Sequence, residues 1–155
     1  MRFRTMAGVV ALALSVGGAG EAAASMPSPP TVVPTFAFVK SVTKVGGKVL
    51  LRVDPALFLT GVSAEVAASD DGTEAYDFYI RNSDHKLVTF ALGAGAKIWV
   101  VSNKNGQLSK SEVAIETLEL IAKGKKPAGV YSPSFGWWLT VKGDTVTALA
   151  QQYTP

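Results

Sequence analysis

Residues 36–54 read FAFVKSVTKVGGKVLLRVD, two apolar runs joined by a Gly-Gly pair. A two-residue loop of this kind accepts positive φ angles and is typical of a tight β-hairpin. In the second run Val49, Leu51 and Val53 share one face, and the alternate positions, Asp54 among them, fall on the other. This stretch therefore predicts a hairpin in an antiparallel sheet with one buried side.

The rest of the chain shows more short apolar runs, most of them separated by turn residues. Gly93-Ala94-Gly95 is expected to separate two of the strands. Because short turns link most neighbours, we expect about six or seven strands in a mainly antiparallel sheet or a partly closed barrel. After the first hairpin, the expected strands cover residues 76–82, 86–92, 96–102, 135–141 and 145–153.

Two short helices complete the expected fold. Thr60 or Ser63 could cap the first helix. Ser109, with Glu112 three residues later, forms a capping-box pattern that predicts the start of the second helix. Residues 36–155 are thus expected to form a single β-rich α+β domain, with the helices covering one face or one end of the sheet.

The N-terminal segment predicts export from the cell. Residues 1–24 have a basic start, an apolar run over 6–16 and a small-residue end, which are the three parts of a signal peptide. Cleavage is expected between Ala24 and Ser25, giving a secreted, extracellular product. The apolar run is too short to span a bilayer, and the sequence has no second apolar segment of 18 residues, so we expect no transmembrane segment in the mature chain. Residues 25–35 are rich in proline and are expected to form a linker.

The composition excludes several classes of function. The chain has no cysteine and a single histidine, His85, which excludes disulfides, thiolate metal sites and any site that needs two imidazoles. Its formal net charge of +3 is too small to indicate a nucleic-acid partner. We therefore expect no metal, no cofactor and no nucleic acid.

The densest polar group lies at residues 81–85 and includes Ser83, Asp84 and His85. These side chains are the ingredients of a nucleophilic triad. Adjacent residues on one loop, however, cannot readily place a base between a nucleophile and an orienting acid. We interpret the group as a turn whose side chains bond to their own backbone.

The strongest interaction candidate is Phe-Gly-Trp-Trp at residues 135–138. Neighbouring strand positions point to opposite faces, so Trp137 is expected in the core and Trp138 on the outside. An exposed indole can stack on a sugar ring or anchor a protein partner. The predicted contact residues are Trp138, Tyr131 and Tyr153.

Three short segments resemble a group of uncharacterised secreted proteins of Gram-positive bacteria. Tyr79-Ile80-Arg81-Asn82 is similar to a Tyr-Ile-x-Asn strand of that group, and residues 139–146 also resemble it. Gln152-Tyr153-Thr154-Pro155 is similar to its Gln-Tyr-x-Pro ending. The resemblance covers roughly residues 53–155. It implies one domain and an export signal, and no activity, because the group has no established function.

The sequence thus predicts a secreted, non-enzymatic binding module of the extracellular space or the cell envelope. Its expected partner is an extracellular protein or a cell-wall polysaccharide. Two alternatives remain open, so catalytic activity is left undecided. One is a protease inhibitor that presents a loop such as residues 123–134. The other is a small carboxylate-dependent hydrolase, whose acid pair could come from Asp54, Asp77, Asp84 or Asp144.

Overall fold

The computed structural model describes residues 32–155. The signal peptide expected over residues 1–24, its cleavage site and the linker residues 25–31 lie outside the described residues. Among the helices of the described part, none combines the length and the apolar character that a membrane crossing requires.

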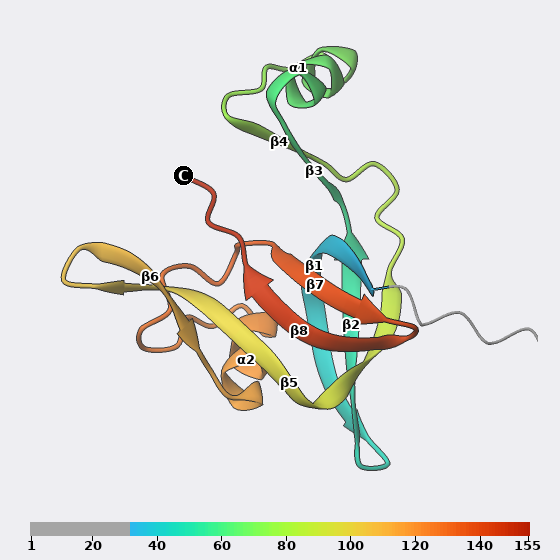
Figure 1. Cartoon of the computed structure of the whole chain (residues 1–155), viewed down its shortest axis with the longest axis vertical. Helices are drawn as coiled ribbons and strands as arrows, with labels where there is room; N and C mark the ends of the chain where they lie inside the picture. The colour runs from blue at the N-terminus through green and yellow to red at the C-terminus, as the bar shows by residue number, and fades with distance from the viewer. Residues whose placement is uncertain (1–31) are drawn as a thin grey trace, which may run out of the picture.

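Five strands close into a barrel (Figure 1). β1 (Val32–Val45), β2 (Lys48–Pro55) and β5 (Val88–Lys104) are successive antiparallel neighbours, and β7 (Trp137–Lys142) returns to pair with β1. β8 (Thr145–Gln151) then pairs antiparallel with β7 and parallel with β5, which completes the barrel. The return of the fourth strand to the first is a Greek-key order, and a five-stranded Greek-key barrel is the architecture of OB-type folds.

Three further strands and two helices are added to this barrel. β3 (Leu57–Thr60) and β4 (Phe78–Arg81) form a separate two-stranded sheet, and β6 (Gln107–Glu112) pairs with the end of β5. α1 (Gly61–Asp70) connects β3 to β4, and α2 (Ile115–Ala122) lies between β6 and β7 in the chain. The predicted α+β fold with a partly closed barrel is confirmed, although residues 32–155 form eight strands where about six or seven were expected.

At residues 93–95, where the sequence predicts a gap between two strands, the structure has a bend within one strand. The two strands predicted on either side of Gly93-Ala94-Gly95 are a single strand, β5, whose register against β8 shifts across this segment. Gly95 has a positive φ of 78°, and a Cβ on Gly93 would lie 3.3 Å from the Thr145 side chain. Small residues therefore bend the strand here without ending it, as a closed barrel requires.

Two boundaries also differ from expectation. The capping-box prediction was wrong, because Ser109 and Glu112 lie in β6 and the helix begins at Ile115. The Ser109 hydroxyl instead lies 2.9 Å from the hydroxyl of buried Ser102 on β5, so cross-strand pairing decides the conformation. At the other end, residues 32–35, expected in the linker, belong to β1 and pair with β7.

The barrel interior is filled by alternate side chains of its strands and is closed by α2. In β7, Trp137, Leu139 and Val141 are buried, as strand alternation predicts, and Trp137 is the largest fully buried side chain in the described chain. Glu119 of α2 forms an ion pair with Lys44 of β1 at 2.7 Å, which fastens the helix to the barrel. The core comprises Ala37, Leu51, Val53, Ile98, Val100, Leu118, Ile121, Val130, Trp137, Leu139, Val141, Val146 and Leu149.

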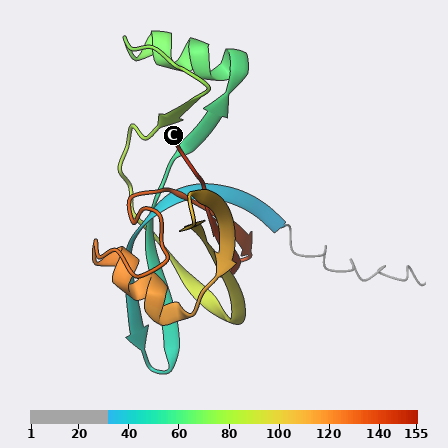
Figure 2. The ribbon, with the colours of Figure 1, turned by 90° about the vertical axis from the view of Figure 1, so that its left-hand side faces the viewer.

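β3, α1 and β4 project from one end of the barrel as a small module (Figure 1; Figure 2). α1 begins after Thr60, whose side chain makes no capping hydrogen bond, and it buries three alanines while contacting β3 and β4. Phe58 of β3 stacks on Phe78 of β4 with ring centroids 5.4 Å apart, and it also lies 5.1 Å from the ring of Phe36 in the barrel. Aromatic packing therefore joins the module to the barrel.

Candidate functional site

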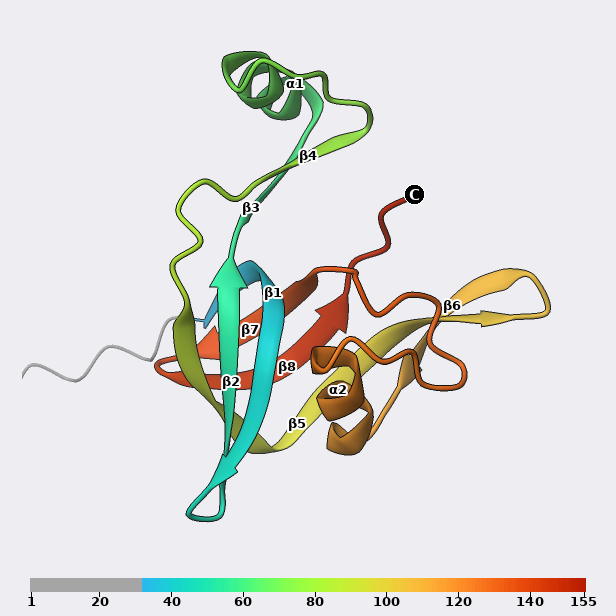
Figure 3. The same cartoon turned by 180° about the vertical axis from the view of Figure 1, so that it is seen from behind.

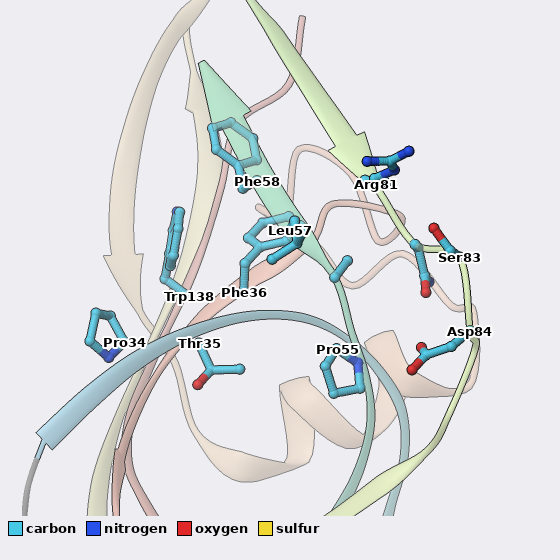
Figure 4. A pocket seen from close by; sticks show the side chains of 12 residues that line it. Pro34, Thr35, Phe36, Pro55, Leu57, Phe58, Arg81, Ser83, Asp84 and Trp138 are labelled. Atoms are coloured by element: carbon cyan, nitrogen blue, oxygen red, sulfur yellow. The ribbon is translucent and has the colours of Figure 1, made fainter. Parts of the chain in front are cut away.

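A pocket of about 580 Å³ opens where the module meets the barrel. Its lining comes from the start of β1, the end of β2, β3, the end of β4 with the segment that follows it, and one residue of β7. In Figure 4 the rings of Phe36, Phe58 and Trp138 lie on one side of the pocket, and Arg81, Ser83 and Asp84 lie on the segment across from them. We call it the aromatic pocket, and it is lined by residues 34–36, 55–58, 81–84 and Trp138.

One wall of the aromatic pocket consists of three rings. Phe36 lies 5.3 Å from Trp138 and 5.1 Å from Phe58, and the Trp138 and Phe58 rings are 5.8 Å apart, all measured between centroids. Trp138 is half-buried, and its indole N–H donates to Gln152 Oε1 at 3.1 Å, which sets the orientation of the ring. A Cβ on Gly136 would lie 2.2 Å from Phe36, so only glycine lets Phe36 reach this position.

The opposite wall is polar and comes from residues 81–84. Arg81 donates to Asp71 at 2.6 Å, and the Tyr79 hydroxyl donates to the same carboxylate at 2.9 Å. The hydrogen bond from Arg81, followed by that from Tyr79, holds the pKa of Asp71 below its ordinary value. Because Asp71 directly follows α1, this network ties the module helix to the strand that leads into the polar wall.

Asp54, the residue before Pro55 of the pocket lining, carries a buried carboxylate. Asp54, which alternation placed on the outer face of β2, is only 2 % exposed. Its Oδ2 atom lies 3.4 Å from Lys40 Nζ and 3.6 Å from His85 Nδ1. Burial acts to raise the pKa of Asp54, but the neighbouring side chains of Asn82, Lys40 and His85 outweigh it and hold the pKa below its ordinary value.

This cluster anchors the segment that carries the polar wall. His85 is the one histidine of the chain and has a φ of 48°, which is uncommon for a residue other than glycine. Its contact with Asp54 holds the segment between β4 and β5 against β2. Asn82 has a buried Oδ1 atom with no hydrogen-bond partner in the described part of the protein, and Asn82 itself lines the aromatic pocket.

Replacing Asp54 with asparagine should change how stability depends on pH. The folded-state pKa of Asp54 is lowered, so its stabilising contribution is present above the unfolded-state pKa and is lost as pH falls through the folded-state value. We expect wild-type stability to fall on acidification from about pH 5 to pH 3, and the fall to be shallower in Asp54→Asn. Urea unfolding at several pH values measures this, with exposed Asp77→Asn as the control. Equal pH slopes in wild type and Asp54→Asn would contradict the assignment.

The predicted contact residues fall at two places. Trp138 lines the aromatic pocket, as its outward position on β7 suggests. Tyr131 and Tyr153 do not line it. They lie together, with ring centroids 6.0 Å apart, and both contact the ring of Phe135. The sequence analysis missed Phe36 and Phe58, because no local pattern shows that β1 and β3 meet beside β7.

The polar group at residues 81–85 includes a bend at Asp84, and it also makes a contact that was not expected. The Asp84 carboxylate accepts a long hydrogen bond from the Lys86 backbone N–H at 3.4 Å, which fits the turn interpretation. His85 contacts Asp54, a residue distant in the sequence. Of the four aspartates considered for a hydrolase, Asp84 is the one that lines the aromatic pocket among the described residues.

A second pocket, of about 670 Å³, lies beside the bend of β5 and the start of α2. Small and aliphatic residues dominate its lining, Lys48 is its one charged residue, and the lining includes no aromatic ring from the described part of the chain. It offers fewer directional contacts than the aromatic pocket, which is therefore the candidate functional site.

The fold and the site thus define a cysteine-free Greek-key barrel with a lateral aromatic pocket. No protein-family model, no curated protein and no solved structure matches the chain significantly.

Proposed function

We propose that this protein is a secreted, non-enzymatic binding module that holds a neutral cell-wall polysaccharide in its aromatic pocket. The observation that carries the proposal is the division of the pocket into an aromatic wall and a polar wall. A sugar ring has the same two-sided character, since its C–H faces are apolar and its hydroxyl groups point outward. The volume of the aromatic pocket, about 580 Å³, lies in the usual range for small-ligand sites.

The aromatic wall supports stacking. Trp138 is half-buried and held by Gln152, so little ring mobility is lost when a ligand packs on it. Phe36 and Phe58 meet the indole at interplanar angles of 63° and 68°, and these edge-to-face contacts hold the ring in place. A rigid aromatic ring is typical of a residue that contributes strongly to binding.

The polar wall supports recognition of hydroxyl groups. Asn82 lines the pocket, and its side-chain amide is a group that can exchange hydrogen bonds with a sugar hydroxyl. Asp84 adds a carboxylate acceptor, and Ser83 adds a hydroxyl that can donate or accept. Arg81, the one cation of the lining, is paired with Asp71, so the pocket favours a neutral ligand over an anionic one.

Replacing Trp138 with alanine tests this function. We expect binding of a neutral oligosaccharide to weaken about tenfold or more, because truncating a central aromatic contact commonly costs more than about 1 kcal/mol. The measurement is isothermal titration of the purified protein with the disaccharide, tetrasaccharide and hexasaccharide of N-acetylglucosamine and of glucose. Tyr76→Ala is the control, because Tyr76 is 87 % exposed and does not line the pocket.

The result distinguishes the alternatives. Binding that is unchanged in Trp138→Ala, or that is equally weakened in Tyr76→Ala, would remove the aromatic pocket as the site. Failure of the wild-type protein to bind either series would remove a neutral glycan of these types as the ligand. Shortening of the oligosaccharides during the titration would support the hydrolase alternative. Export remains part of the proposal and rests on residues 1–24.

A further inference from the structure

Tyr131 and Tyr153 form a second aromatic surface outside the pocket. Their side chains are 37 % and 38 % exposed, although each packs on a ring of buried Phe135, at 5.8 Å and 5.6 Å between centroids. The two tyrosine rings are tilted by 60° to one another. Each ring is therefore fixed by its neighbours while part of its surface stays open to solvent.

The backbone around both tyrosines is held in place. The Tyr131 N–H donates to the Val101 carbonyl at 2.8 Å, which pins the segment before β7 to β5. The Gln152 N–H donates to the Gly136 carbonyl at 2.9 Å, which extends the pairing of β7 and β8 beyond the last residue of β8 and fixes the start of the C-terminal tail. Both tyrosines are thus presented from ordered backbone.

The tyrosine pair is connected to the aromatic pocket through Gln152 and Gly136. Gln152 links the two, because its side chain accepts a hydrogen bond from the Trp138 indole and donates one to the Tyr153 carbonyl at 2.8 Å. Gly136 lies between them in the chain, with Phe135 under the tyrosines on one side and Phe36 of the pocket packed over its Cα. Figures 1 and 3 show the C-terminal tail rising from the barrel end that carries the projecting module.

The two segments that carry Trp138 and the tyrosine pair have no charged side chain. Residues 131–138 read YSPSFGWW, and residues 151–155 read QQYTP. Aromatic rings among serine, glutamine and threonine side chains match a ligand that offers hydroxyl groups and apolar ring faces without net charge. A polyanion or a strongly charged protein surface would find no complementary charge on these two segments.

We propose that Tyr131 and Tyr153 form a second subsite for the same neutral polysaccharide, so that the protein binds an internal stretch of a polymer and not a single sugar. This inference rests on the proposed function of the aromatic pocket. One sugar residue stacks in the aromatic pocket, and a residue further along the same chain packs on the tyrosine pair. Gln152 lies between the two subsites and offers its amide group to the intervening sugar hydroxyls.

The dependence of affinity on oligosaccharide length tests this inference. We compare wild type, Trp138→Ala and the double variant Tyr131→Ala/Tyr153→Ala, using the disaccharide and the hexasaccharide of the series that binds. The hexasaccharide should bind wild type about tenfold more tightly than the disaccharide, and the double variant should lose this gain while binding the disaccharide normally. Trp138→Ala should weaken both ligands.

Conservative variants distinguish a loss of binding from a loss of folding. Tyr131→Phe/Tyr153→Phe keeps both rings and should retain at least part of the length-dependent gain, and Tyr153→Ser alone should lose part of it. If Tyr131→Ala/Tyr153→Ala binds the hexasaccharide as tightly as wild type, the second subsite is overturned. The pocket proposal still stands in that case if Trp138→Ala binds more weakly. Absence of glycan binding by wild type would overturn both.

Discussion

Replacing Trp137 with alanine is expected to lower the free energy of unfolding by about 3–5 kcal/mol. Trp137 is 1 % exposed and packs in the barrel core with residues from β2, β5, β8 and α2. Its removal leaves a cavity that the paired strands around it cannot collapse to fill, so lost apolar burial and lost packing add together. Urea unfolding followed by far-ultraviolet circular dichroism measures the change without depending on tryptophan fluorescence.

The adjacent tryptophan supplies a matched control. Trp138→Ala removes the same side chain from the next position of β7, where the ring is half-buried, and it should cost clearly less stability. Trp137→Phe should fall between wild type and Trp137→Ala, because it removes less volume. Equal losses in Trp137→Ala and Trp138→Ala would show that the two tryptophans do not divide between core and surface.

Replacing Gln151 with alanine is expected to lower the free energy of unfolding by about 2–4 kcal/mol, because each buried polar group left unpaired costs about 1–3 kcal/mol. Gln151 is 3 % exposed. Its Oε1 accepts from the Val101 N–H at 3.0 Å, and its Nε2 donates to the Ser132 carbonyl at 3.0 Å. One side chain thus satisfies two backbone groups and joins β8, β5 and the segment before β7.

Gln152→Ala is the control for this variant. Gln152 is only partly buried, and its side chain bonds the Trp138 indole and the Tyr153 carbonyl, which solvent can reach more easily. We expect a much smaller change in stability and a weaker hold on Trp138. Urea unfolding of both variants separates the roles, and a Gln151→Ala protein as stable as Gln152→Ala would contradict the structural role of Gln151.

Local patterns predicted the parts of this fold that depend on neighbouring residues. The alternation in β2 and β7 placed Leu51, Val53 and Trp137 in the core and Trp138 outside it, since successive side chains of a strand point to opposite faces. The Gly-Gly turn likewise predicted the first hairpin. The same reasoning failed at Asp54, because Lys40 of β1 and His85 of the segment after β4 lie against its carboxylate.

The capping-box error has a related cause. Ser109 and Glu112 have the spacing of a helix start, but both are paired with β5, where Ser109 bonds Ser102 and Glu112 forms an ion pair with Lys97 at 2.8 Å. Tertiary pairing overrides a capping signal that is worth only about 1 kcal/mol. The residues that pair in this way lie too far apart in the sequence for a local pattern to reveal the pairing.

By itself, the sequence determined the β-rich class, the absence of cysteine and the outward position of Trp138. Only the tertiary structure decided that Phe36 and Phe58 surround that indole and that Tyr131 meets Tyr153. The physical reason is that alternation is a property of neighbouring residues, whereas these aromatic groupings depend on barrel closure. That closure comes from the return of β7 to β1 and the parallel pairing of β8 with β5, which bring distant segments together.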